Sequence, residues 1–298
     1  MHFWELLRSA ARRNTPHPLG GATMGNIWVT ENLYSYFRTS LSVRRILVDE
    51  RSEYQHIQVL ETDFFGRALL LDGNLQLTEL DNAGYHEMMV HVPALVVGAP
   101  RRALIVGGGD GAALAQMLRY PSLEEIVVCE IDRRVVEVCR EHFPAFRAVW
   151  DDPRVRLVVR DAYAYMEENP GTFDVICADM TDPLGMSERL FSEDFYRLIV
   201  RALAPHGAAS AQCDQPYFGD ELIRRLYAFA RTLVKHPAYY QAFIPSYPGG
   251  GNGFLYLSNR PWEEGLNKPY PPGENHYLNP EIHRAAFALP EFLKRKLE

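Results

Sequence analysis

From residue 102 onwards the chain alternates between short apolar segments and helical segments, and this alternation constrains the fold more than any other feature. The apolar segments are ALIVGGG, EIVVCEID, VRLVVRDA, FDVICADM and GAASAQCDQ. The segments between them, such as RRVVEVCREHF and SEDFYRLIVRALA, carry apolar residues at helical spacing. Strands that are apolar on both faces and separated by helices indicate a parallel sheet covered on both sides. The sequence therefore predicts an α/β fold.

Two further regions flank this α/β core. Before it, residues 43–80 alternate apolar and polar residues around an Asp72-Gly73 turn, which is typical of a small antiparallel sheet. After it, YYQAFIPS and GFLYLSN flank the glycine-rich YPGGGNG and predict an antiparallel hairpin. Residues 85–97 carry apolar residues at helical spacing. We expect three parts: a leader at 1–25, a small antiparallel β domain at 26–84, and the catalytic domain at 85–298.

Composition narrows the possible functions. A net charge of −7 and a pI near 5.8 argue against a general nucleic-acid binder. This mild acidity first serves solubility, and it also suits a cationic small molecule. No apolar stretch approaches the ~18 residues of a membrane span, and the start MHFWELLRSAARR lacks the apolar core of a signal peptide. We therefore expect a cytoplasmic protein without a membrane or nucleic-acid partner.

The cysteines also indicate a cytoplasmic protein. There are four, none in a C-x-x-C pair, and three lie in strand-like segments: Cys129, Cys177 and Cys213, with Cys139 in a helical one. This distribution favours reduced, buried thiols over disulfides or a zinc site.

The segment ALIVGGGDGAALAQML joins a predicted strand to a predicted helix through a glycine loop. Gly107, Gly109 and Ala112 satisfy the pattern G-x-G-x-x-G/A, and Glu130 follows Gly109 by 21 residues at the end of the next strand. This arrangement is typical of a nucleotide site with the acid on a ribose. Nicotinamide enzymes and adenosyl-methionine enzymes both place such a loop there, so the pattern alone does not separate them.

Asp110 separates these two classes. A carboxylate beside the helix start would repel a pyrophosphate, whereas it would favour a cationic ligand without phosphate. Adenosyl-methionine and its relatives carry a sulfonium and an ammonium, so Asp110 favours them. The alternative is that Asp110 only caps the following helix.

Acidic residues also follow other predicted strands. Glu130, Asp161 and Asp179 come at three successive strand ends, and Asp182 follows in ADMTDPLG. Because the carboxyl ends of parallel strands meet at one edge of a sheet, we expect a nucleoside site along that edge. Taken singly, Glu130 could be a solvated strand end and Asp161 a helix N-cap.

A series of motifs occurs in order from about residue 28 to the C-terminus: YQHIQV, LDGNLQLTE, YHEMMVHVP, LIVGGGDG, EID, DPRVRLVVRDA, DMTDPLG, LFSEDFY, IPSYPGG and NPEIHRAAFALP. Together they resemble the aminopropyltransferases of polyamine synthesis, spermidine synthases in particular. The resemblance implies a small antiparallel β domain followed by a Rossmann-like, methyltransferase-type domain. It implies decarboxylated adenosyl-methionine as donor, a diamine such as putrescine as acceptor, methylthioadenosine as by-product and no prosthetic group. A homodimer or homotetramer is the expected assembly.

The resemblance also implies roles for individual residues. Asp179 matches the family's proton acceptor, with the Tyr85 hydroxyl orienting the attacking nitrogen, and Asp110 matches the group that holds the donor's ammonium. The residues that match the nucleoside site are Gln55, Gly107, Gly109, Glu130, Asp161 and Ala162. Those that match the amine channel are Gln76, Tyr85, His86, Asp179, Asp182, Gln212 and Tyr247, with Trp28 as an aromatic wall.

The chain departs from the family pattern in three places. Asn82 and Ala83 replace a usual acid before the YHEM-like motif, which bears on how the far end of the acceptor is held. Met186 stands where the family has proline, which bears on packing against adenine. AQCDQPYF replaces a version with glutamate and tryptophan. These departures affect acceptor identity more than the reaction type.

The implied reaction explains why paired acids follow a strand. An amine attacks the carbon beside a sulfonium, and it must first lose a proton. An exposed carboxylate of pKa about 4 is a poor base for an ammonium of pKa about 10, a gap of about 8 kcal/mol. Desolvation narrows this gap, and closure of YPGGGNG or TDPLGMSE would provide it. Asp182 would keep the second acceptor nitrogen charged and in place.

Other functions are weighed against this one. An amine N-methyltransferase would use intact adenosyl-methionine, whose carboxylate Asp110 disfavours. A nicotinamide dehydrogenase is disfavoured by the same residue, and a polyamine-binding protein would have no use for a catalytic base. Agmatine, cadaverine or a triamine are alternative acceptors. His86 and His91 are five residues apart rather than four, which argues against a zinc site, so no metal is expected.

Overall fold

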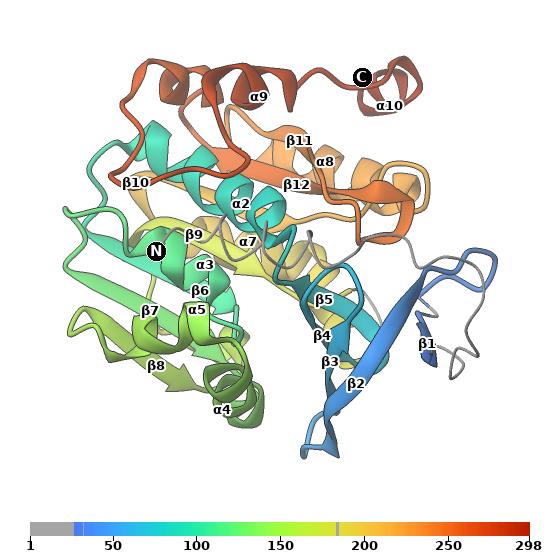
Figure 1. Ribbon diagram of the computed structural model, residues 1–298. Coiled ribbons are helices and arrows are strands. Elements are labelled where there is room, and N and C mark those ends of the chain that lie inside the picture. The colour runs from blue at the N-terminus through green and yellow to red at the C-terminus, as the bar shows by residue number, and fades with distance from the viewer. Residues whose placement is uncertain (1–26, 32, 183–184) are drawn as a thin grey trace.

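The computed structural model describes residues 27–31, 33–182 and 185–298 (Figure 1), with the side chains of residues 185 and 186 also left out. The expected leader at 1–25 therefore lies outside the described residues. These residues form a five-stranded sheet and a seven-stranded sheet, with helices packed against the larger one. Within the described part of the chain, no helix has the length and apolarity that crossing a bilayer requires.

The N-terminal sheet is an antiparallel meander. Its strands follow chain order: β1 (Ile27–Thr30), β2 (Ser40–Arg51), β3 (His56–Thr62), β4 (Arg67–Leu71) and β5 (Asn74–Thr78). The turn between β4 and β5 is Asp72-Gly73, with φ values of 48° and 79°. Two consecutive positive φ values give the tight hairpin turn for which Asp-Gly is favoured, as the sequence predicts.

The larger sheet has the order β11-β12-β10-β9-β6-β7-β8. Its strands are β6 (Arg102–Gly107), β7 (Glu125–Glu130), β8 (Val155–Val159), β9 (Phe173–Asp179), β10 (Leu203–Gln212), β11 (Ala238–Phe243) and β12 (Gly251–Ser258). The pairs from β8 to β10 are parallel, whereas β12 pairs antiparallel with both β10 and β11. The predicted fold class, including the C-terminal hairpin, is confirmed.

Helices cover both faces because successive side chains of each central strand point to opposite sides. On β9, Ile176 and Ala178 pack in one core with the helices at Ala162–Glu167, Glu193–Ala202, Asp220–Leu233 and Glu291–Leu297, whereas Val175 and Cys177 pack in another with the helices at Asn82–Val97 and Ala112–Met117. The helices are α2 (Asn82–Val97), α3 (Ala112–Met117), α4 (Arg133–His142), α5 (Pro144–Arg147), α6 (Ala162–Glu167), α7 (Glu193–Ala202), α8 (Asp220–Leu233), α9 (Pro280–Ala285) and α10 (Glu291–Leu297). Short 3₁₀ turns are η1 (Ala148–Asp151), η2 (Gly185–Phe191), η3 (Pro248–Gly250) and η4 (Trp262–Asn267).

Helix α2 links the two sheets. It begins at Asn82, so the expected division between residues 84 and 85 falls inside it. Its residues from Gly84 to Val96 are buried, because the helix is enclosed by the larger sheet, α3 and η4. All four cysteines are buried and free.

A separate apolar core fixes the N-terminal sheet to helix α4, beside the larger sheet. Ile57 and Leu69 of the small sheet pack with Val135 and Val138 of α4. Polar contacts reinforce this packing: Arg134 pairs with Glu50 at 2.5 Å. The small sheet is thereby held over the carboxyl edge of the parallel strands, where the candidate site lies.

Candidate active site

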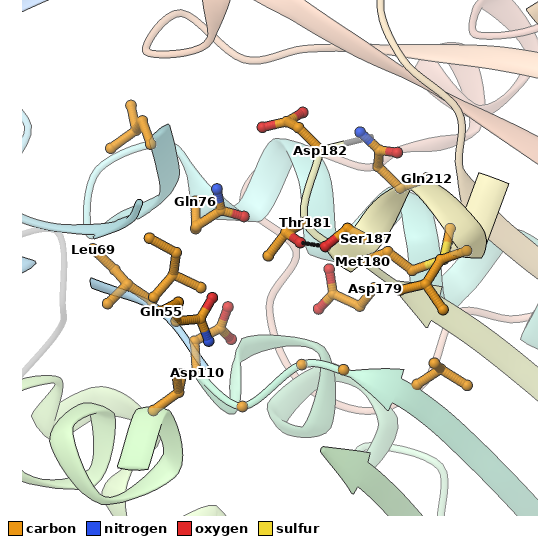
Figure 2. Close-up of a pocket in the computed structure, with 18 of the residues that line it drawn as sticks. Gln55, Leu69, Gln76, Asp110, Asp179, Met180, Thr181, Asp182, Ser187 and Gln212 are labelled. Atoms are coloured by element: carbon orange, nitrogen blue, oxygen red, sulfur yellow. Dashed lines mark hydrogen bonds between the residues drawn. The ribbon is translucent and has the colours of Figure 1, made fainter. Parts of the chain in front are cut away.

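A cavity of about 330 Å³ lies between the two sheets, and Figure 2 shows part of its lining. The N-terminal sheet contributes Gln55, Leu69 and Gln76 to its wall. The ends of β6, β7, β8 and β9 and the loops after them contribute the glycine loop and the strand-end acids. The cavity therefore occupies the edge at which ligands bind in open α/β sheets.

The glycine loop approaches its neighbours too closely for side chains. A Cβ on Gly107, whose φ is 74°, would lie 2.1 Å from the backbone oxygen of Asp179. A Cβ on Gly109 would lie 2.9 Å from Glu130 Oε2. Glycine at these positions lets the turn after β6 pass against β9 and β7 and leaves its backbone facing the cavity.

Asp110 fits both of the interpretations that the sequence leaves open. Its Oδ1 accepts a hydrogen bond of 2.6 Å from the Ala112 amide, which is a cap on the helix start. Its Oδ2 lies 3.9 Å from His86 Nε2, and the residue lines the cavity. One oxygen is therefore held by the helix and the other is placed toward the site.

Asp179 ends β9 beside this loop. Its Oδ2 lies 3.8 Å from His86 Nε2 and has no hydrogen-bond partner among the described residues. Burial raises the pKa of Asp179 to about 7, and the nearby Asp110 charge adds to the rise, although His86 and the Tyr85 hydroxyl act in the opposite direction. A nearly buried carboxylate with a free oxygen is suited to accept a proton.

Two residues of α2 stand over Asp179. The ring of Tyr85 lies 4.9 Å from that of His86, and Tyr85 lines the cavity. His86 lies behind the cavity lining, and its Nδ1 is 2.9 Å from the Asn82 carbonyl oxygen. A carbonyl oxygen only accepts, so this contact places a proton on Nδ1, and Nε2 faces Asp110 and Asp179.

The predicted nucleoside residues lie together on the other side of the loop. Glu130 is buried and its Oε1 accepts from the Asp132 amide at 2.9 Å, while burial raises its pKa to about 7. Gln55 donates to Asp132 Oδ2 at 3.0 Å. Asp161 caps α6 through the Tyr163 amide, as the alternative interpretation holds, yet it also lines the cavity next to Ala162.

The predicted amine-channel residues continue past Asp179. Asp182, Gln76, Gln212 and Tyr247 all line the cavity, and the Tyr247 hydroxyl donates to the Gln76 carbonyl oxygen at 2.5 Å. The pKa of Asp182 is raised to about 7 by burial and by the charges of neighbouring acids. The side-chain oxygen of Gln212 is buried and has no partner among the residues described.

Trp28, like His86, is a predicted amine-channel residue outside the cavity lining. It lies on the edge strand β1, 60% exposed, and it is not among the cavity-lining residues. Within the chain it is therefore not the aromatic wall that the motif match implies. Tyr34, which the motif comparison did not single out, lines the cavity together with Tyr247.

Sequence reasoning also missed two acids, Glu31 and Asp214. Both are buried and line the cavity near Asp182. Asp214 lies in the segment AQCDQPYF, and the departure of this segment from the family pattern is the one sequence signal that could have drawn attention to it. Glu31 precedes the irregular segment after β1, where no periodic pattern marks it.

The remaining departures from the family pattern are at Asn82, Ala83 and Met186, and none of them is a described part of the cavity lining. The Asn82 amide donates to the carbonyl oxygens of Thr78 and Glu79, both at 3.0 Å, and so joins β5 to α2. Neither Asn82 nor Ala83 lines the cavity. The Met186 side chain lies outside the described atoms.

A cation of either kind, an ammonium or a metal ion, suits the centre of the site. His86, Asp110 and Asp179 each offer one atom, and these atoms lie within 4.8 Å of one another. His91, the other histidine of the motif, instead contacts the Tyr120 hydroxyl at 3.0 Å in the core. The two histidines do not share a site.

Comparison with known proteins identifies the family. The family described as spermine/spermidine synthase domain matches residues 82–264, and the spermidine synthase tetramerisation domain matches residues 27–79. A polyamine aminopropyltransferase of Thermoanaerobacter pseudethanolicus is 41% identical over 90% of this chain and 97% of its own length. The spermidine synthase of Dictyostelium discoideum is 38% identical over 87% of this chain and 92% of its own.

Solved structures of spermidine synthases share the fold of this chain. The spermidine synthase of Thermotoga maritima superposes with a TM-score of 0.84 at 30% identity, covering 95% of this chain and 99% of that one. A spermidine synthase in complex with the transition-state analogue AdoDATO superposes with a TM-score of 0.85 at 30% identity, covering 93% and 98%. The chain therefore belongs to the spermidine synthase family of polyamine aminopropyltransferases, and it is an enzyme of that class.

Proposed function

We propose that the enzyme transfers the aminopropyl group of decarboxylated adenosyl-methionine to a diamine, putrescine in the first place. The observation that carries this proposal is the placement of Asp179, a nearly buried carboxylate with a free oxygen, beside the glycine loop and Asp110. A spermidine synthase of the same fold binds the transition-state analogue AdoDATO, which supports this donor.

The nucleoside of the donor would lie along the loops after β6, β7 and β8. Glu130 would accept hydrogen bonds from the ribose hydroxyls, and Gln55, which lines the same cavity, would also contact the nucleoside. Asp161 and Ala162 would bind the base. Asp110 would hold the donor's ammonium, because its free oxygen faces the cavity while its other oxygen is fixed by the helix.

The acceptor would lie between Asp179 and the acids beyond it. Asp182 and Gln212 would hold the ammonium that does not react. The reacting amine loses a proton to Asp179, and Tyr85 orients its nitrogen. The nitrogen lone pair forms a bond to the carbon beside sulfur as the carbon–sulfur bond breaks. The electron pair of that bond stays on sulfur, which becomes the neutral thioether of methylthioadenosine.

Burial makes this proton transfer feasible. With the pKa of Asp179 at about 7, the gap to an amine of pKa about 10 is about 4 kcal/mol, half that for an exposed aspartate. The same desolvation lowers the pKa of the bound amine and narrows the gap further. Orientation of amine and sulfonium in one cavity supplies much of the remaining acceleration.

We also propose that the chain works as a homodimer or homotetramer. The match of residues 27–79 to the spermidine synthase tetramerisation domain supports this assembly. On this proposal β1–β5 form the assembly unit as well as one wall of the cavity. Sedimentation of the purified enzyme at several concentrations would test it, and a monomer at all of them would contradict it.

The activity test is a matched assay of the purified enzyme. Putrescine, cadaverine and agmatine are each combined with decarboxylated and with intact adenosyl-methionine, and products are read by mass. We expect one aminopropyl unit on putrescine with the decarboxylated donor alone. A methyl group transferred from the intact donor would overturn the role given to Asp110 and favour an amine N-methyltransferase.

A further inference from the structure

The end of the cavity proposed for the base carries one cation whose hydrogen-bonding capacity is largely unused. Of the described residues that line the cavity, two are arginines, Arg160 and Arg189, and none is a lysine. Arg160 directs both of its terminal nitrogens to Glu168, away from the cavity. The Arg189 guanidinium makes one hydrogen bond within the described chain, to Asp161 Oδ2 at 3.2 Å. A guanidinium has five N–H donors, so most of those of Arg189 are open to a ligand.

Arg189 is nevertheless fixed in position. Its guanidinium carbon lies 4.1 Å from the centre of the Tyr163 ring, a favourable place for a cation. Its carbonyl oxygen accepts from the Tyr163 hydroxyl at 2.6 Å, and the Ser192 hydroxyl lies 2.6 Å from that of Tyr163. Both parts of the residue are therefore held against the start of α6, beside Asp161 and Ala162, the residues proposed to bind the base.

A purely structural role does not account for this side chain. The side chains of Arg189 and Asp161 are 57% and 39% exposed, and ion pairs of such exposure add little stability. The bond from the Tyr163 hydroxyl already joins η2 to α6, and any residue at position 189 would accept it through its carbonyl oxygen. The guanidinium is therefore available for a function in the cavity that it lines.

Asp161 and Arg189 together present an acceptor and a donor side by side. Asp161 Oδ1 accepts from the Tyr163 amide at 2.8 Å, and its Oδ2 has a second lone pair beside the one that Arg189 uses. Adenine carries the complementary pair, because its amino group donates and the ring nitrogen next to it accepts. The carboxylate serves only the amino group, whereas the planar guanidinium supplies a donor for the ring.

We propose that Arg189 is a further base-binding residue of the donor site. Its guanidinium donates to a ring nitrogen of adenine, N1 or N7, while Asp161 accepts from the amino group beside it. This inference rests on the proposed function and adds a residue to its donor site. The base takes no part in bond breaking, so this contact is equally strong in the ground state and the transition state. Its loss should raise KM for the donor and leave kcat unchanged.

The test measures binding of methylthioadenosine and of its 1-deaza and 7-deaza analogues by calorimetry. The variant is Arg189→Met, which keeps much of the side-chain length and removes the donors. The control is Arg197→Met in α7, because Arg197 also pairs with an acid, Asp194, and lies over an aromatic ring, Phe229, but is not among the cavity-lining residues. A charge-assisted hydrogen bond changes an affinity by about 10-fold or more. We expect Arg189→Met to bind methylthioadenosine about 10-fold more weakly, with the same factor in the donor KM, and the control to change neither.

The analogues separate a contact with the base from a change in the shape of the site. For one of them, the unmodified enzyme should bind about 10-fold more weakly than it binds methylthioadenosine, and Arg189→Met should weaken that binding no further. Equal weakening of all three ligands by Arg189→Met would overturn the ring-nitrogen contact. Unchanged methylthioadenosine affinity in that variant, or a loss in kcat at unchanged donor KM, would also overturn it.

Folding and the underlying function are checked separately. Thermal melts identify folded variants, and Arg189→Leu carries the test if Arg189→Met fails to fold. Binding of methylthioadenosine to the unmodified enzyme with no effect of either variant would overturn the role of Arg189 alone. Absence of methylthioadenosine binding to the unmodified enzyme would overturn the proposed function and this inference with it.

Discussion

Replacement of Asp179 by asparagine isolates the proposed proton transfer from binding. The amide matches the carboxylate in size but cannot take a proton from the amine. General-base catalysis contributes about 10²-fold to 10⁴-fold, so we expect kcat to fall by that factor. The buried Oδ2 has no hydrogen-bond partner among the described residues. The substitution therefore breaks no hydrogen bond there, and the melting temperature should not fall.

The pH dependence gives a second measure of the same residue. Because the pKa of Asp179 is raised to about 7, its carboxyl is protonated and inactive as a base below that pH. In the unmodified enzyme kcat/KM, which reports the free enzyme, should rise as pH increases through about 7. In Asp179→Asn this rise should be absent from the residual activity.

Single-turnover product formation read by mass, with methylthioadenosine binding measured by calorimetry, checks both expectations. Glu130 and Gln55, the residues proposed to hold the nucleoside, lie on the other side of the glycine loop, so nucleoside affinity should stay within about threefold, under 1 kcal/mol. Residual kcat above a tenth of the original value would refute Asp179 as the base. Loss of nucleoside binding would show that the residue builds the site instead of acting in the reaction.

Two further substitutions test the cavity. Asp182→Asn should raise the melting temperature of the ligand-free enzyme more at pH 8 than at pH 5. The pKa of Asp182 is about 7 in the folded enzyme and near 4 in the unfolded chain. As the pH rises from about 4 to about 7, the buried carboxyl group loses its proton and destabilises the folded enzyme, and the asparagine variant is spared this loss. A larger gain at pH 5 in pH-resolved thermal melts would contradict the assigned burial. Gly107→Ala would place a Cβ 2.1 Å from the Asp179 backbone oxygen at a φ of 74°, so we expect a lower melting temperature and no measurable methylthioadenosine binding. Wild-type affinity by calorimetry would show that the loop can shift without loss of the site.

Much of the site could be predicted because it depends on local patterns and one rule of topology. Glu130 and Asp179 end parallel strands, and the carboxyl ends of such strands meet at one edge whatever the intervening segments contain. Asp110 follows directly from its place in the glycine loop. Its double role, with one oxygen on the helix and one in the cavity, could not be read from sequence because both roles call for the same residue.

The end of the cavity near Asp182 could not be predicted, because it is assembled from distant segments. Tyr34 donates to Asp214 across 180 residues of chain, and neither lies in a periodic element that would reveal its direction. Motif position drew attention to Trp28 instead. That residue lies on β1, which pairs with β2 alone at the edge of its sheet, and its side chain is left exposed.

The buried acids of the cavity destabilise the enzyme when no ligand is bound. Glu31, Asp182 and Asp179 are each shifted toward a pKa of about 7, so near neutral pH the empty cavity holds a mixture of protonated and charged acids. A neutral ligand would displace water without adding charge, and it would therefore favour the protonated forms. A polyamine would favour the charged forms, and protons would leave the carboxylates as its ammonium groups bind. Acceptor binding should therefore release protons. Burial of these acids lowers the stability of the empty enzyme, and a bound polycation offsets this loss by pairing with the carboxylates.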